Sequence, residues 1–235
     1  MREVTRHGIS FLVNSDTVNN DFWDIDNWEL ENYSIVYEIS KTTSTFINAG
    51  GWIGPFTLFA SKIFKDVFSL EPDIVAFEEL KSNITLNQLT NVKIYNKAFS
   101  NEDSFITIGS DHSDLGRSGT SIFQTKNSIQ VQSSTLETFF KEENIPFNSF
   151  LMLDVEGAEY LLFDNYEFFR KNRPTILLSL HLTLLSDCNF NVLIERLGRL
   201  ESLYEFDLKT ILSSRASLSF NSHFRELNIL MIPKI

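Results

Sequence analysis

The stretch TFINAGGWIGPFTLFA, residues 45–60, decides the fold of this chain. Its apolar start predicts the end of a short buried strand, Gly50, Gly51 and Gly54 predict a tight turn, and Pro55 predicts the start of a helix. In such a unit, free backbone amides and the helix dipole point into the turn. The stretch therefore predicts a cradle for an anionic or nucleotide ligand, although an ordinary strand-to-helix turn has the same pattern.

The next strand and helix bring a carboxylate to the same place. Residues 67–70 predict a second buried strand, and Glu71 follows it about 20 positions after Gly50. Adjacent parallel strands end side by side, so a carboxylate here can accept hydrogen bonds from both hydroxyls of a ribose. A helix over 74–87, capped by Asp73, and a strand over 92–98 would complete a β-α-β-α-β half.

A second group of polar residues follows in NSFLMLDVEGAEYLLF, residues 148–163. Residues 150–153 predict a buried strand, and Asp154 and Glu156 stand two residues apart at its carboxyl end, on one face while the chain stays extended. Two such carboxylates repel each other unless a cation, a shared proton or hydrogen-bond donors lie between them.

His181 is expected to join these carboxylates. It ends a predicted strand over 175–180, and that strand should lie beside the strand over 150–153. A histidine there can act as a general base near neutral pH or as a metal ligand, or it can be satisfied by a neighbouring carbonyl. A metal held by Asp154, Glu156 and His181 is the less favoured variant, so the sequence assigns no metal site.

The remaining segments predict a cover and a second half of the sheet. Residues 1–44 are expected to form a helical and extended cover, and residues 45–235 one compact domain. Within the cover, residues 1–20 are predicted to be loosely attached, with one edge strand over 9–13. Trp28 fits core packing or a pocket wall. Further predictions are a lid or solvated loop over 109–128, a helix over 135–143 capped by Ser134, a helix over 187–200, strands over 204–206 and 227–232, and a polar connection between these two.

Composition limits the partners. The chain has 235 residues, 43% of them hydrophobic, which is enough for one large domain. A net charge of -11 argues against nucleic-acid partners, because these require a basic surface. The most apolar run, residues 175–185, is too short to span a bilayer, so no membrane insertion is expected. A single cysteine, Cys188, fits a reducing compartment, and a cytoplasmic location is expected.

Four blocks follow one another along the chain. NAGGWIGPFT (48–57) is similar to D-[IV]-G-A-x-I-G, which often continues as W-I-G-P-T, and EPDIVAFEELKSN (71–83) matches E-P-D followed by A-[YF]-E-E-L-K-x-N. MLDVEGAE (152–159) is similar to K-[IV]-D-[IV]-E-G-x-E, and SLH (179–181) matches the later S-L-H. In this order, and over roughly residues 28–182, the blocks resemble the FkbM family of S-adenosyl-L-methionine-dependent methyltransferases.

The resemblance implies an α/β, Rossmann-like class I methyltransferase fold: a mostly parallel seven-stranded sheet with helices on both faces and an antiparallel last strand. It implies S-adenosyl-L-methionine as cofactor and methyl transfer, commonly to a hydroxyl of a saccharide or other small molecule. Carried over by position, the implied cofactor residues are Asn48, Gly50, Gly51 and Gly54 at the methionine end, Glu71 at the ribose, Ala98 near the adenine, and Asp154. The resemblance also implies that Asp154 faces the cofactor's amino group or the acceptor, with Glu156 and His181 beside the acceptor. We take these three as the catalytic residues and predict His181, oriented or charge-balanced by Asp154 and Glu156, as the general base.

Two departures from the family pattern matter for function. Asn48 replaces an Asp, which removes a charge that would favour a cationic cofactor, and Met152 replaces a common Lys. The alternatives are therefore a catalytically weakened cofactor-binding or interaction module on the same fold, or a nicotinamide-dependent oxidoreductase that shares the first half of the fold. The sequence leaves the acceptor open, and also whether the chain forms a homo-oligomer.

Overall fold

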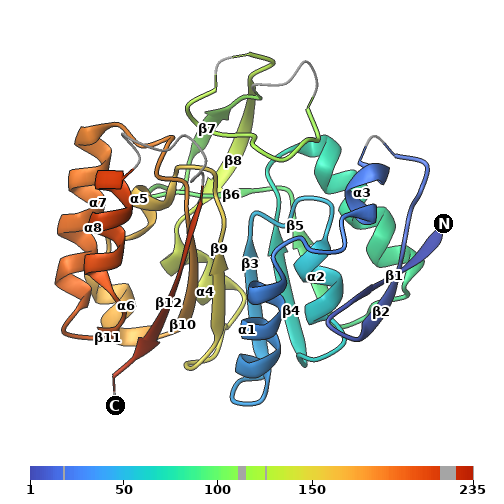
Figure 1. Cartoon of the computed structure of the whole chain (residues 1–235), viewed down its shortest axis with the longest axis horizontal. Helices are drawn as coiled ribbons and strands as arrows, with labels where there is room; N and C mark the ends of the chain where they lie inside the picture. The colour runs from blue at the N-terminus through green and yellow to red at the C-terminus, as the bar shows by residue number, and fades with distance from the viewer. Residues whose placement is uncertain (18, 111–114, 125, 218–225, 235) are drawn as a thin grey trace.

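The computed structural model describes residues 1–17, 19–110, 115–124, 126–217 and 226–234. A seven-stranded sheet lies at its centre (Figure 1). Its strands lie side by side in the order β11 (Tyr204–Glu205), β12 (Leu227–Pro233), β10 (Thr175–Leu180), β9 (Phe150–Leu153), β3 (Thr45–Ala49), β4 (Asp66–Leu70) and β5 (Val92–Tyr95). β12, the last strand, runs antiparallel to both neighbours, whereas the strands from β10 to β5 are parallel. The predicted sheet is therefore confirmed.

Helices cover both faces of this sheet, because side chains alternate along each strand. Phe46 of β3 packs on one side and Ile47 on the other. The side of Phe46 carries α1 (Leu30–Ser40), α2 (Pro55–Ala60) and α3 (Ile74–Leu86). The side of Ile47 carries α4 (Leu136–Glu142), α5 (Glu159–Leu162), α6 (Tyr166–Asn172), α7 (Asp187–Leu200) and α8 (Leu208–Ser217). Within the described residues, no helix has the length and apolar character that a membrane crossing requires.

The N-terminal segment is packed against the core, and the expectation of a loose attachment for residues 1–20 is wrong. β1 (Arg2–Arg6) and β2 (Ile9–Val13) form an antiparallel hairpin, followed by the 3-10 helix η1 (Asn20–Asp24). Phe11 and Val13 are buried in the same cluster as Phe46. Asn87, at the end of α3, accepts a hydrogen bond from the Leu12 N–H and donates one to the Leu12 carbonyl, which fixes the hairpin on that helix.

A three-stranded sheet lies beside the main one and consists of β6 (Ala98–Phe99), β7 (Phe105–Ile108) and β8 (Ile129–Ser134). The single strand predicted over 92–98 is therefore two strands, β5 in the main sheet and β6 in the small one, because the chain leaves the main sheet at Asn96. The Asn96 amide there donates to the Glu71 and Pro72 carbonyls.

Two smaller predictions about helices also fail. Thr135, not Ser134, caps α4, because its hydroxyl accepts from the Thr138 N–H. The polar connection predicted between the last two strands contains α8, and the rest of that connection, residues 218–225, lies outside the described part of the chain.

Candidate functional site

The glycine turn between β3 and α2 uses its own amides. The N–H groups of Gly50 and Gly51 both donate to the Leu70 carbonyl, at 3.0 and 2.9 Å. The Trp52 N–H donates to Glu71 Oε2 at 2.7 Å, and the Gly54 N–H donates to the Gly51 carbonyl at 2.9 Å. These four amides are already paired with protein acceptors, so they do not form the expected cradle for an anion.

The glycines are needed instead for close packing. A Cβ on Gly50 would lie 1.9 Å from the Asp154 carbonyl oxygen, and one on Gly51 would lie 2.2 Å from Ser69 Oγ. Gly54 has a φ of 105° and precedes α2, and a Cβ on it would lie 2.8 Å from Leu80 Cδ1. The glycines thus let the end of β3 approach the loop after β9, which brings Asp154 close to the turn.

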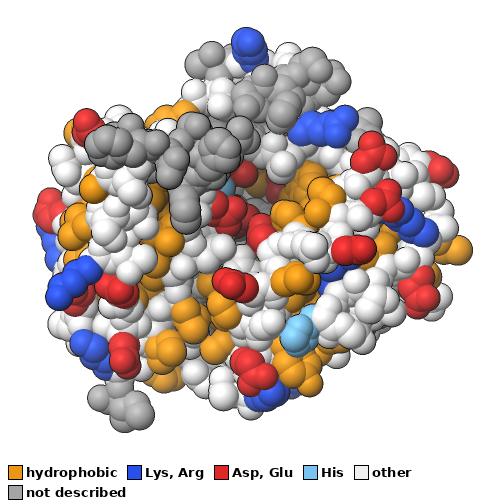
Figure 2. All heavy atoms as spheres, viewed as in Figure 1, with side chains coloured by type: hydrophobic (Ala, Val, Ile, Leu, Met, Phe, Trp, Pro, Cys, Tyr) orange, Lys and Arg blue, Asp and Glu red, His pale blue; other side chains and the backbone are white. Residues whose placement is uncertain are grey.

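A cavity of about 350 Å³ opens where the parallel strands end. Figure 2 shows acidic side chains gathered around a hollow near the middle of the visible face. Eight of the residues expected from the sequence line the cavity: Asn48, Gly50, Gly51, Glu71, Ala98, Asp154, Glu156 and His181. Gly54 does not line it. Trp28 does, which favours the pocket-wall alternative for that residue.

Glu71 is held at one end of this cavity by backbone amides. It follows β4, is 6% exposed, and accepts hydrogen bonds from the Trp52 and Asp73 N–H groups at 2.7 and 2.8 Å, one on each oxygen. Burial raises its pKa from 4.5 to about 8, and the two amide hydrogen bonds oppose that rise. Each oxygen keeps a lone pair for a further donor, as the recognition of a hydroxyl pair requires.

Asn48 belongs to a buried chain of polar side chains. Its Nδ2 donates to Thr57 Oγ1 at 3.1 Å, and Thr57 in turn donates to Ser69 Oγ at 2.9 Å. Asn48 is 2% exposed but lines the cavity. The amide is therefore well satisfied where the family pattern has an Asp, and the cavity has one charge fewer at this point.

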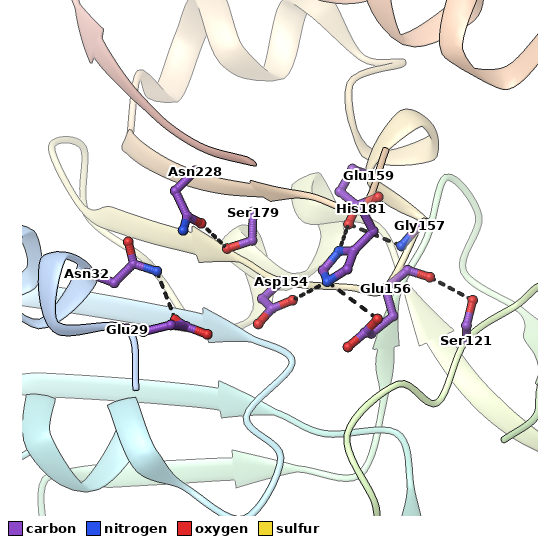
Figure 3. A network of polar contacts seen from close by, with 10 residues as sticks. All are labelled: Glu29, Asn32, Ser121, Asp154, Glu156, Gly157, Glu159, Ser179, His181 and Asn228. Carbon is purple, nitrogen blue, oxygen red and sulfur yellow. Dashed lines mark hydrogen bonds and ion pairs between the residues drawn. The ribbon is translucent and has the colours of Figure 1, made fainter. Parts of the chain in front are cut away.

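The carboxylates after β9 and the histidine after β10 meet at the other end of the cavity (Figure 3). His181 Nε2 lies 3.6 Å from Asp154 Oδ1 and 3.4 Å from Glu156 Oε2. β9 and β10 are neighbours, as the sequence predicts. The reason given for Glu156 is wrong, however: its φ is 50°, so a left-handed turn and not an extended chain brings it beside Asp154.

Glu159 is one residue of this site that the sequence analysis missed. It is fully buried at the start of α5, and its Oε1 lies 2.8 Å from His181 Nδ1 and accepts from the Gly157 N–H at 3.1 Å. Its spacing, three residues after Glu156 in the block resembling the family, was the available signal. Without the turn at Glu156 and Gly157, that spacing did not indicate which way the side chain would point.

The charges of this cluster depend strongly on one another. Burial lowers the pKa of His181, but the hydrogen bond with Glu159 and the charges of Asp154, Glu159 and Glu156 outweigh it and raise that pKa to about 10. Burial raises the pKa of Asp154 well above its usual range and also raises that of Glu156, while positive His181 opposes both shifts. In the protein alone, the cluster therefore holds a positive charge on His181 at neutral pH.

Two further acids, not foreseen from the sequence, line the same cavity. Glu29, before α1, has a pKa raised to about 7 by burial and by the charge of Glu226, which precedes β12. Glu29 accepts a hydrogen bond from Asn32 Nδ2 at 2.8 Å. The end of the cavity around His181 thus has one acid from the N-terminal part of the chain and one from the C-terminal part. It favours groups that carry positive charge or donate hydrogen bonds.

The donor set of the cavity fits S-adenosyl-L-methionine. Glu71 offers acceptors for ribose hydroxyls, and the apolar Ala98, Ile106 and Ile108 form a surface for a flat base. Asp154 Oδ1 is buried without a hydrogen-bond partner among the described residues, so it can accept from an ammonium group or face a sulfonium. A dinucleotide fits less well, because its pyrophosphate would need the amides that the glycine turn uses itself.

Two solved structures of methyltransferases share the fold of this chain. A solved rRNA methylase from Streptococcus thermophilus has a TM-score of 0.54 at 8% identity, over 90% of this chain and 99% of that one. A candidate methyltransferase from Streptococcus mutans, in complex with SAH, has a TM-score of 0.51 at 7% identity, over 86% of this chain and 97% of that one. At these identities the likeness shows the fold alone.

Sequence comparison supplies the family. No curated protein matches the chain significantly. A family model described as Methyltransferase FkbM domain matches residues 48–206, which is more than half of the chain. That match confirms the resemblance found in the four sequence blocks and, with it, S-adenosyl-L-methionine as the cofactor. The chain belongs to the FkbM family of methyltransferases.

Proposed function

We propose that this protein transfers the methyl group of S-adenosyl-L-methionine to a hydroxyl oxygen of a saccharide or other small molecule. The observation that carries the proposal is the shared cavity, with Glu71 at one end and the cluster of Asp154, Glu156 and His181 at the other. Bound there, the cofactor would supply an electrophilic methyl carbon. The chain would align the acceptor oxygen with it and take up the proton that the oxygen loses.

The cluster is the proposed destination of that proton. The sequence predicts His181 as the base, but a pKa of about 10 means that His181 is already protonated at neutral pH in the protein alone. It can accept a proton only after another positive charge beside Asp154 and Glu156 lowers its pKa. The positively charged sulfonium of the bound cofactor would supply this second charge. We therefore keep His181 as the proposed base for the protein with cofactor bound and without a metal ion at the cluster.

A small uncharged or cationic acceptor suits the cavity better than nucleic acid. At the end around His181, Glu29, Glu156 and Glu226 face the cavity together with Asp154, so that end repels a phosphate group, although Lys97 and Arg117 also line the cavity. Hydroxyl and amino groups can donate hydrogen bonds to the same carboxylates.

The first experiment tests cofactor choice and reaction separately. S-adenosyl-L-homocysteine should raise the unfolding temperature and NADH should not, whereas stabilisation by NADH alone would favour the nicotinamide-dependent alternative. An acceptor screen with labelled S-adenosyl-L-methionine should then yield labelled product from a neutral or amino saccharide. Cofactor binding without transfer to any member of a broad saccharide panel would favour the weakened binding module.

The second experiment tests the base. With an acceptor in hand, His181→Ala should lower turnover at saturating substrate by about 10²–10⁴-fold, the usual effect of losing general-base catalysis. Unchanged turnover would remove His181 from that role while leaving the methyl-transfer proposal intact.

A further inference from the structure

We infer that Asp154, Glu156 and His181 form a binding site for one divalent metal ion of the Mn²⁺ or Mg²⁺ class. One ligand atom from each of these residues lies within 4.8 Å of the other two, at the wall of the cavity. The site deepens the proposed function, because the ion would lie beside the acceptor, but binding of the ion itself does not depend on methyl transfer.

The spacing of the three ligand atoms is close to that of a metal site. Metal–ligand bonds of about 2.0–2.2 Å place ligand atoms of one ion roughly 3 to 4 Å apart. His181 Nε2 is already 3.4 Å from Glu156 Oε2 and 3.6 Å from Asp154 Oδ1. Small side-chain rotations would therefore suffice to close the triangle around an ion.

The histidine is held as metal-binding histidines usually are. Such a residue commonly donates its second ring N–H to a carboxylate, which fixes the ring and leaves the other nitrogen free for the metal. Figure 3 shows His181 between Glu159 on one side and Asp154 and Glu156 on the other. Fully buried Glu159 lies 2.8 Å from Nδ1, so Nε2 faces the two cavity carboxylates. His181 is itself only 8% exposed.

Asp154 offers an ion a carboxylate oxygen that no described residue uses. Asp154 Oδ1 is buried and has no hydrogen-bond partner among the described residues. The Asp154 N–H pairs with the Ala49 carbonyl and continues the ladder between β9 and β3, which fixes the residue at the cavity wall. Two adjacent carboxylates repel each other, and an ion bound to His181 Nε2 would lie between them and contact both. Two oxygens and one imidazole suit Mn²⁺, and Mg²⁺ less well.

A metal ion would change the role of His181. Its Nε2 would be a ligand and could no longer accept a proton, and the positive ion would lower the pKa of an acceptor hydroxyl beside it. The metal site and general-base catalysis by His181 are therefore alternatives.

Direct titration with Mn²⁺ tests the inference without any activity assay. The full chain, freed of metals with EDTA, is titrated with MnCl₂ while free Mn²⁺ is followed by electron paramagnetic resonance. We expect one bound ion per chain, weakened more than about 100-fold in Asp154→Asn and in His181→Gln. In Glu159→Gln we expect weakening by about 10- to 100-fold, the effect of losing the carboxylate behind a ligand histidine.

Glu29→Gln is the matched control, because it removes one cavity carboxylate that is not in the triangle. It should bind Mn²⁺ within about threefold of the unchanged chain, since loss of a ligand costs far more than loss of a nearby charge. Mn²⁺ should also raise the unfolding temperature of the unchanged chain but not that of Asp154→Asn, which shows that the variant folds and lacks the site. No stoichiometric binding by the unchanged chain, or equal binding by Asp154→Asn, would overturn the inference.

Binding of S-adenosyl-L-homocysteine is measured on the same samples. A chain that binds Mn²⁺ but not S-adenosyl-L-homocysteine would keep the metal site and lose the proposed function. The opposite result would lose the metal site and keep the proposed function.

Discussion

At the scale of single residues, Glu71 links charge to cofactor binding. A protonated carboxyl can accept from fewer donors than a carboxylate, and both oxygens of Glu71 already accept a backbone amide. Because its pKa is raised to about 8, we expect the affinity for S-adenosyl-L-homocysteine to increase several-fold as the pH rises from about 6.5 to about 9. Calorimetric titrations across this range check the slope, and Glu71→Gln should bind weakly with no such slope.

The same shift affects stability with the opposite sign. The pKa of Glu71 is higher in the folded chain than its ordinary 4.5, so the folded state holds the proton more tightly between these values. Its contribution to stability is complete below about pH 4.5 and is lost as the pH rises through about 8.

For the binding prediction, a pH slope in S-adenosyl-L-homocysteine affinity that survives in Glu71→Gln would assign the titration to another group.

Asn48 is an uncharged residue at a position where the family pattern has a carboxylate. Asn48→Asp restores the carboxylate of the family pattern, and Thr57 can turn its hydroxyl to donate to it. Only the methyl donor carries the sulfonium charge, so the variant should improve the affinity for S-adenosyl-L-methionine relative to S-adenosyl-L-homocysteine by about 1–2 kcal/mol, a factor of 5–30. Calorimetry with both ligands measures the ratio. Asn48→Leu, which adds no charge, should leave the ratio unchanged, and an unchanged ratio in Asn48→Asp would place Asn48 away from the sulfonium.

The sequence predicted which side chains stand together at strand ends better than it predicted the contacts that each of them makes. Asp154 and His181 lie together because neighbouring parallel strands end together, which follows from strand order. Glu159 and the paired amides of Gly50 and Gly51 could not be foreseen, because they depend on backbone turns that fix where a side chain or an N–H points.

At the scale of elements, the turn between β3 and α2 depends on contact with the loop after β9. Gly50→Ala would bring a methyl group into the Asp154 carbonyl at a φ of 89°, so the cost combines a clash with a left-handed backbone. Gly8→Ala is the matched control, since Gly8 has a φ of 76° and a Cβ added there would meet nothing within 4 Å.

We expect Gly8→Ala to cost about 1–2 kcal/mol, the left-handed penalty alone, and Gly50→Ala to cost at least about 3 kcal/mol. Urea unfolding measures both. Gly50→Ala should also weaken Mn²⁺ binding, because it displaces Asp154. Equal costs for the two variants would mean that the β9 loop moves freely away from the turn.

Strong local patterns predicted elements, and weak ones did not. β3, β9 and β10 are fully buried or nearly so and are flanked by clear breaks; the predicted bounds of β9 and β10 match, and β3 ends where the sequence predicts a strand end. α8 was missed because Ile211 is its one buried residue and its second half is rich in serine. The order of the strands was beyond local pattern, because it depends on crossovers between distant parts of the chain.

At the scale of the whole molecule, the N-terminal segment and the sheet share one core. Val36 of α1 is fully buried in the same cluster as Phe46 of β3 and Leu58 of α2. Trp28, two residues before α1, lines the cavity. Residues 1–44 therefore serve both the core and the site, and we predict that they and residues 45–235 unfold as one cooperative unit, with equal calorimetric and van't Hoff enthalpies.

Val36→Ala tests this coupling from the N-terminal side. Loss of two buried methyl groups should cost about 2–3 kcal/mol and lower the single unfolding temperature by about 4–12 °C for a chain of this size. Leu30→Ala, in the same helix but 45% exposed, should change it by no more than about 2 °C, since substitutions at exposed positions usually stay within about 0.5 kcal/mol. Scanning calorimetry of the three chains gives the answer. Two resolved transitions, with Val36→Ala lowering only one, would mean that the cover folds apart from the sheet, and the wall that Trp28 and Glu29 give the cavity would then be able to open without unfolding the rest.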